Sequence, residues 1–315
     1  MEKYFLEENE KEKLLAFCGY GHYPTAQIAF LGNEEGLAGY ELPFGIKARC
    51  ASFGLNPDTY IGSSWRNGYY EMGEIVDPLF EKEMLRLRGS LRPPGKLKSP
   101  MLEFQARMML FMEHGFTGDW FKKSTEDPHS YVLITDYYRN IGRYESSGLY
   151  KRSAKIGSAL LDLRPFPRRD EGKAGNKWPY ANINEKQYNK AFSFQDLPGI
   201  TEEYKQLRDI RAQYLMNAIT TYRFPIIIGI GDKESKRHFF ERYFDAEFKP
   251  DKMMSLTKNK LEVFISEPVN DWGMIVVLSD FFDHGFKGIG LNGLRILTTQ
   301  IITPLIKEKL IPPQP

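Results

Sequence analysis

The chain has 315 residues, of which 42% are hydrophobic, and its formal net charge is +2. This length and apolar content suit one large or two modest packed domains, and so small a charge neither favours nor excludes a nucleic-acid partner. Only Cys18 and Cys50 are present, which excludes a disulfide framework and a four-cysteine metal or iron–sulfur site. The N-terminus is charged and no run approaches twenty apolar residues, so we expect a cytoplasmic protein without a signal peptide or membrane span.

Helices and apolar strands are predicted to alternate along the chain. Predicted helices span residues 1–19, 101–113, 200–221, 233–244 and 290–309, and predicted strands span 27–32, 131–134, 159–163, 224–231, 261–266 and 274–278. Apolar strands separated by helices form parallel sheets that are covered on both faces. We therefore predict a three-layer α/β/α fold with a central parallel sheet of about four strands. We predict a single domain, 1–315, with an inserted elaboration around 45–130.

Polar residues follow the predicted strands where the strands end. They are Asn33, Glu34 and Glu35 after the first strand, Asp136 after the second, Asp162 and Arg164 after the third, and Asp280, Asp283 and His284 after the last. Because the carboxyl ends of parallel strands meet at one edge of a sheet, we expect these side chains to converge. Carboxylates, an amide and a histidine at one edge favour an acid/base hydrolytic site. An ordinary surface turn is the alternative interpretation of the loop at 32–36.

Several common kinds of site are disfavoured. No Gly-x-Ser-x-Gly motif and no Walker lysine motif occur, and the stretch 229–231 lacks the third glycine of a dinucleotide motif. The five histidines are scattered, and none pairs with another at a metal-ligand spacing. We therefore expect neither a metal nor a cofactor.

Three stretches together resemble motifs of the uracil-DNA glycosylase superfamily. The first runs from Ile28 to Gly36 and continues into Leu42-Pro43-Phe44-Gly45, like the family's strand, its Gly-x-x-Pro-Gly-like loop and the Pro-Phe pair that follows. Residues 160–167 are similar to the family's central strand, which ends in a base-reading asparagine. Residues 277–285 stand where the family carries a histidine motif and a loop that wedges into the duplex. The resemblance implies a four-stranded parallel sheet with flanking helices, and DNA as the partner.

The resemblance also implies roles for single residues. It places candidate catalytic residues at Asn33, Glu34, Glu35 and His284, and candidate base-binding residues at Phe44, Asp162 and Asp280. The first three would orient water and stabilise the cationic sugar, and the histidine would hydrogen-bond the departing base. The chain departs from the family where Glu35 replaces a proline, where Glu34 stands in place of Asp, Asn or Ala, and where the His-Pro-Ser triplet is absent.

Asp162 stands where the family has asparagine, and this difference bears on the substrate. An ionised carboxylate only accepts hydrogen bonds, whereas asparagine both donates and accepts. A carboxylate would repel a carbonyl of uracil but accept a hydrogen bond from the exocyclic amino group of cytosine. If Asp162 faces the pocket, cytosine or a modified cytosine is the better substrate. If it caps a turn or pairs with Arg164, it says nothing about the base.

Basic residues are the candidates for contact with DNA phosphates. They are Arg86, Arg88, Arg92, Lys96 and Lys98 in a segment rich in proline and glycine, and Arg164, Arg168 and Arg169 after the third strand. A solvated surface is the alternative interpretation of these residues. Candidates for a wedge that enters the duplex are Phe281, Phe282, Phe286 and Ile289. Core packing is the alternative for most of them.

The predicted function is therefore that of a DNA glycosylase, which flips a base out of the duplex and hydrolyses its N-glycosidic bond to leave an abasic site. Asp162 and the insertion favour a bulky base, such as the glucosylated hydroxymethylcytosine of phage DNA, and hence a role in anti-phage defence. Three alternatives stay open: a uracil-DNA repair glycosylase, a hydrolase of nucleosides or nucleotides, and a non-catalytic DNA-binding module of the same fold.

Overall fold

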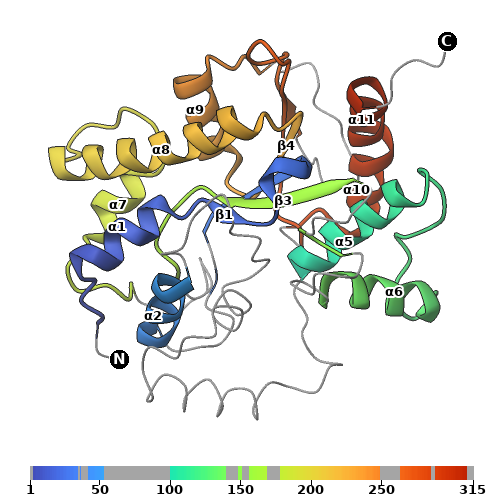
Figure 1. Cartoon of the computed structure of the whole chain (residues 1–315), viewed down its shortest axis with the longest axis horizontal. Helices are drawn as coiled ribbons and strands as arrows, with labels where there is room; N and C mark the ends of the chain where they lie inside the picture. The colour runs from blue at the N-terminus through green and yellow to red at the C-terminus, as the bar shows by residue number, and fades with distance from the viewer. Residues whose placement is uncertain are drawn as a thin grey trace.

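The computed structural model describes residues 3–34, 36, 42–52, 100–139, 148–150, 156–168, 178–248, 263–284 and 288–310. In these ranges six strands form one sheet in the order β1-β3-β2-β4-β6-β5. The four central strands are parallel: β3 (Gly157–Asp162), β2 (Ala26–Gly32), β4 (Ile226–Ile230) and β6 (Ile275–Ser279). The fold is therefore of the α/β class, and the prediction of about four central parallel strands is confirmed (Figure 1).

The two edges of the sheet are short antiparallel strands, so the whole sheet is mixed. The predicted edge strand at 261–266 is present as β5 (Phe264–Ile265), which pairs with β6. β1 (Gly19–Tyr20) pairs with β3 and was not predicted, because two residues are too few to show a periodicity. A Cβ at Gly19 would lie 1.8 Å from the Leu160 carbonyl oxygen, so only glycine allows this close approach.

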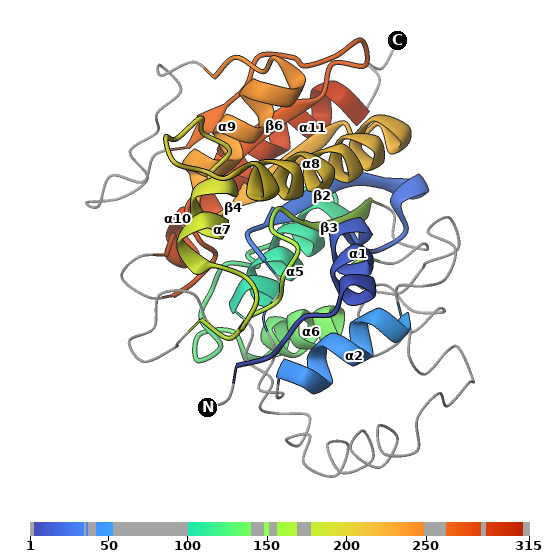
Figure 2. The ribbon, with the colours of Figure 1, turned by 90° about the vertical axis from the view of Figure 1, so that its left-hand side faces the viewer.

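Helices pack on both faces of the sheet and enclose two apolar cores (Figures 1 and 2). One face is covered by α1 (Glu8–Ala16), α2 (Leu42–Ser52), α7 (Glu185–Ala191), α8 (Glu202–Tyr222) and α9 (Lys233–Phe244). The other face is covered by α5 (Pro100–Glu113), α6 (Pro128–Arg139), α10 (Gly290–Ile296), the π-helical segment η4 (Leu297–Ile302) and α11 (Thr303–Leu310). A 3₁₀ turn, η1 (Tyr23–Thr25), leads into β2. Side chains of successive strand residues point alternately into the two cores, as the two-residue period of a strand requires.

The prediction of a strand at 131–134 is wrong, because this segment lies inside α6. The Asp127 carboxylate accepts hydrogen bonds from the backbone N–H of Ser130 at 3.0 Å and from its hydroxyl at 2.8 Å. Pro128 is the first helical residue, so capping chemistry outweighs the β-branched run. Asp136 is consequently an exposed helix residue and does not follow a strand.

Two further segments bear on the predicted organisation. The glycine and aromatic residues from 36 to about 73 predict a long loop, but the structure has a helix there, α2, at Leu42–Ser52. Of the predicted insertion at 45–130, residues 53–99 lie outside the described part of the chain. Within it, α5 packs directly on the sheet. The helical spacing of residues 101–113 predicts that Met108, Met109 and Met112 are buried, and they lie in the core. None of the described helices is both long and apolar enough to span a membrane.

Candidate functional site at the carboxyl edge of the sheet

The loops that leave β2 and β3 run side by side beyond the sheet. The Leu163 N–H donates to the Gly32 carbonyl at 3.1 Å, and the Arg164 N–H donates to the Asn33 carbonyl at 2.7 Å. These bonds hold the two loops together just past the last strand pair, Gly32 and Asp162. The stretch that begins at Gly32 is therefore fixed against the segment that follows Asp162.

The Asp162 carboxylate lies against the end of β2. A Cβ at Gly32 would be 2.8 Å from the Asp162 Oδ1 atom, so glycine makes room for this carboxylate. Asp162 is 6% exposed. Burial, together with the negative charge of Asp162, raises the pKa of the Tyr150 hydroxyl well above its ordinary value. Arg164 pairs with Asp232, whose Oδ2 lies 2.5 Å from the Arg164 Nη2.

A buried lysine on α9, Lys236, holds the Asn33 side chain. Its Nζ atom donates to the Asn33 Oδ1 and to the Gly231 carbonyl, the latter at 2.5 Å. The aliphatic part of Lys236 crosses β4 at Gly229, where a Cβ would lie 2.9 Å from the lysine Cδ. Glycine at position 229 thus leaves room for the Lys236 side chain to reach the carboxyl edge. The role of this glycine is to allow the close packing of α9 on β4.

Substituting methionine for Lys236 is expected to lower the free energy of unfolding by about 1–3 kcal/mol, because the Gly231 carbonyl and the Asn33 carboxamide each lose a buried donor. Methionine keeps an unbranched apolar stem across Gly229. The unfolding midpoint in urea measures this cost. The Lys205→Met change on exposed α8 is the matched control, and equal stability of both variants would contradict the structural role of Lys236.

Glu34 forms a buried ion pair with Arg168. The Arg168 Nε atom donates to the Glu34 Oε1 atom, and the two side chains are only 10% and 6% exposed, respectively. The Arg168 guanidinium also lies 5.6 Å from the centre of the Trp178 ring. Burial and the nearby charge of Glu34 raise the pKa of Tyr188 above its ordinary value. The structure thus places Glu34 at the edge with its charge matched, and it places Arg168 inside the protein.

The end of β6 carries one ion pair and one exposed aromatic ring. The Lys233 Nζ atom lies 2.9 Å from the Asp280 Oδ1 atom, which joins the ends of β4 and β6. Of the wedge candidates, Phe282 and Ile289 are buried in the core, whereas Phe281 is 44% exposed. The Phe281 ring lies over the turn at Gly231, where a Cβ would be 2.9 Å from its Cδ2 atom.

His284 contacts a carboxylate of α5. Its Nε2 atom lies 3.5 Å from the Glu103 Oε1 atom, and its ring packs edge-on against Phe104. Arg107 donates to the same Oε1 atom from Nη2 at 2.8 Å and from Nε at 3.0 Å. Burial alone would raise the pKa of Glu103, but the hydrogen bonds from His284 and Arg107 outweigh it. The pKa of Glu103 therefore lies below its ordinary value.

Because the pKa of Glu103 is lowered in the folded protein, part of the free energy of unfolding depends on pH and is lost in acid. The contribution of Glu103 is fully present above its unfolded pKa, about 4.3, and is lost as the pH falls through the lower folded pKa. Thermal unfolding midpoints should thus fall less steeply between pH 5 and pH 3 in Glu103→Gln than in the wild type. Parallel pH profiles of the two proteins would contradict this assignment.

Two buried polar atoms on the α5 side of the edge have no hydrogen-bond partner among the residues that the structure describes. They are the Gln105 Nε2 and Ser279 Oγ atoms, and both residues are fully buried. The carboxamide oxygen of Gln105 accepts a hydrogen bond from the Tyr150 hydroxyl, which lies near Asp162. A buried donor and a buried hydroxyl that stay unsatisfied each cost stability.

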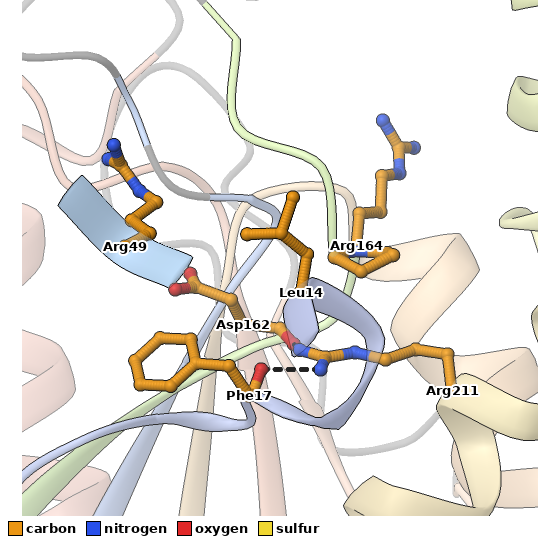
Figure 3. A pocket seen from close by; sticks show the side chains of 7 residues that line it. Leu14, Phe17, Arg49, Asp162, Arg164 and Arg211 are labelled. Atoms are coloured by element: carbon orange, nitrogen blue, oxygen red, sulfur yellow. Dashed lines mark hydrogen bonds between the residues drawn. The ribbon is translucent and has the colours of Figure 1, made fainter. Parts of the chain in front are cut away.

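A small cavity lies between α1, α2 and α8, on the side of Asp162 that faces away from α5 (Figure 3). It is lined by Leu14, Phe17, Arg49, Asp162, Arg164, Pro165 and Arg211 and has a volume of about 10 Å³. This space holds at most one water molecule. Arg211 closes it by donating to the carbonyls of the surrounding chain, one of which is that of Phe17 at 2.5 Å.

The structure thus gathers the described candidates Asn33, Asp162, Arg164, Asp280 and His284 at one edge of the sheet. Glu34 lies at this edge as well, paired with Arg168. The other candidates lie outside the described residues or have undescribed side chains: Glu35, Phe44, Arg86, Arg88, Arg92, Lys96, Lys98, Arg169 and Phe286. Within the described ranges, no group of three or more His, Cys, Asp or Glu residues is placed to hold a metal ion.

Comparison with known proteins finds no matching family model, no matching curated protein and no matching solved structure. What this site does is therefore inferred from its own residues.

Proposed function

We propose that the protein is a DNA glycosylase of the uracil-DNA glycosylase type that removes a modified cytosine, such as glucosylated hydroxymethylcytosine of phage DNA. One observation carries the proposal: polar groups that leave all four parallel strands lie at one edge of the sheet. In open α/β sheets this edge is where ligands bind. A role in anti-phage defence follows from this substrate.

Asp162 and Gln105 support a cytosine-type base. The Asp162 carboxylate lies against Gly32 at the carboxyl edge. An ionised carboxylate at this place accepts a hydrogen bond from an exocyclic amino group. The Gln105 Nε2 atom offers a buried donor for which none of the described residues supplies an acceptor, which suits the ring nitrogen or carbonyl of the same base. An acceptor and a donor that both lie near the Tyr150 hydroxyl suit the edge of an aminopyrimidine. Uracil presents a carbonyl where this site has a carboxylate.

The loop after β2 supplies the groups for the sugar. Cleavage of the N-glycosidic bond builds positive charge on the sugar, as in glycoside hydrolysis. Lys236 fixes the Asn33 carboxamide, so Asn33 is oriented to position water, and the glutamates that follow supply negative charge. The Glu34–Arg168 pair orients the first of them. The side chains then act on a nucleotide that has left the base stack.

The test is an assay of abasic sites. The protein is incubated with duplex DNA that contains glucosylated hydroxymethylcytosine and, separately, with uracil-containing DNA of the same sequence. We expect abasic sites in the first and few in the second. Abasic sites in the uracil DNA alone would show that the substrate is uracil and not a modified cytosine. The absence of abasic sites in both DNAs would overturn the proposed function.

One observation favours a second candidate, a DNA-binding module without catalytic activity. The charge of Glu34 is matched by Arg168 inside the protein, and a neutralised carboxylate stabilises a sugar cation less well. The Glu34→Gln variant distinguishes the two functions. A glycosylase loses base release in this variant, whereas the binding module keeps its salt-dependent DNA affinity and shows no base release in either form.

A further inference from the structure

We propose that Glu103 is a positioning residue that holds the His284 ring in one tautomer and makes it a general acid toward the departing base. The inference rests on the proposed function, and it adds Glu103 to the α5 residue Gln105 in a site built mainly from loops that follow strands. The juxtaposition that carries it is the contact of 3.5 Å between the His284 Nε2 and Glu103 Oε1 atoms.

The two side chains have complementary exposure. The Glu103 side chain is 9% exposed and that of His284 is 45% exposed, so the carboxylate lies behind the ring and the ring faces solvent. Phe104 packs edge-on against the imidazole with ring centres 4.7 Å apart. The backbone N–H of His284 donates to Asp283 at 2.7 Å. The ring is therefore held from the α5 side and from its own loop.

Arg107 keeps Glu103 available as an acceptor. Its two hydrogen bonds to the Oε1 atom hold that carboxylate ionised and in place. Arg107 is itself anchored by donating to the Lys122 carbonyl at 3.0 Å and to that of Trp120. An anchored carboxylate behind one imidazole nitrogen fixes which nitrogen carries the proton. The neutral His284 ring therefore bears its proton on Nε2, and Nδ1 is turned away from Glu103.

This arrangement has a chemical consequence for the proposed reaction. In the proposed step the His284 ring carries a proton on each nitrogen, with Nε2–H toward the Glu103 carboxylate and Nδ1–H toward the departing base. As the bond between C1′ and the base breaks, its electron pair passes to the base, and the Nδ1 proton is transferred to the base. Water adds to C1′ and releases a proton to solvent. The base leaves neutral, which matters more for cytosine than for uracil because an amino group makes the cytosine anion less stable than the uracil anion.

The first test needs no DNA. Nitrogen NMR of protein labelled with ¹⁵N-histidine reports the tautomer of each neutral ring, and the His284→Asn variant assigns the signal among the five histidines. We expect the Nε2–H tautomer for His284 and at least a threefold loss of that preference in Glu103→Gln. Glu113→Gln, on the same helix and bonded to Tyr137, is the matched control and should leave the signal unchanged. A predominant Nδ1–H tautomer in the wild type would overturn the inference.

The second test uses base release from glucosylated hydroxymethylcytosine DNA. We expect Glu103→Gln to lower kcat about 10- to 100-fold with KM nearly unchanged. In a protein that already carries His284→Asn, adding Glu103→Gln should lower kcat little further. A wild-type kcat in Glu103→Gln would overturn the inference while base release itself stands. If the wild type releases no base, the proposed function fails, and the NMR measurement still decides the relation of Glu103 to His284.

Discussion

The Asp162→Asn variant is expected to release a cytosine-type base about 10- to 100-fold more slowly than the wild type. Asparagine can turn its amide nitrogen toward the amino group of the base, and one hydrogen bond to a base edge is worth about 1–3 kcal/mol. The fold should survive, because a buried carboxylate near the Tyr150 hydroxyl is replaced by a neutral group of the same shape. The measurement is the single-turnover rate on glucosylated hydroxymethylcytosine DNA, with uracil DNA assayed in parallel.

The matched control for this substitution is Asp271→Asn, since Asp271 is 76% exposed and lies in the turn that precedes β6, at the other end of that strand from Asp280. It should leave both rates unchanged. If Asp162→Asn keeps the full rate on modified cytosine and gains none on uracil, Asp162 does not read the base.

The Arg211→Met variant is expected to lower the free energy of unfolding by about 3–5 kcal/mol. Arg211 is fully buried, and it donates to the carbonyls of Leu15, Phe17 and Leu163 at 2.8, 2.5 and 3.3 Å and also to that of Asp162. Methionine fills much of the same space but leaves these acceptors without their donor. The urea midpoint and the slope of the transition measure the loss.

The Lys205→Met change serves again as the control for Arg211, because Lys205 lies on the same helix, is 46% exposed and makes only a peripheral contact with Glu202 at 3.5 Å. Its effect should stay within about 0.5 kcal/mol. An equally small effect of Arg211→Met on the free energy of unfolding would show that Arg211 does not stabilise the segments that follow α1 and β3.

The central strands could be predicted because they are apolar on both faces. In β4 every residue is buried, and such runs of β-branched residues between helical segments are typical of parallel sheets. The helix at 233–244 was also predicted with the bounds that α9 has. The segment at 131–134 has the same apolar, β-branched character, yet the Asp127 cap and Pro128 start a helix there.

Part of the site could be predicted from the rule that parallel strands end at one edge. This rule placed Asn33, Asp162 and His284 together, and the structure has all three at the carboxyl edge. It could not find Lys236, whose side chain enters the edge from α9 through the space above Gly229. Such a path depends on packing between a helix and a strand far away in the sequence.

The α5 residues were missed for a different physical reason. The methionine stripe of α5 predicts one buried face, but residues 103 to 112 are all buried. Polar groups such as Glu103 and Gln105 therefore lie inside the protein although the helical period places them off the apolar stripe. Their partners, His284 and Tyr150, come from segments 45 or more residues away along the chain.

The most direct test of the proposed function is the mass of the product that the wild-type protein releases from DNA containing glucosylated hydroxymethylcytosine. A DNA glycosylase releases the whole modified base, with its glucose still attached, and leaves a strand that carries the free sugar. We predict this product, and we predict that its amount equals the number of abasic sites formed. Release of glucose alone, of a nucleotide, or of nothing would contradict the proposed function.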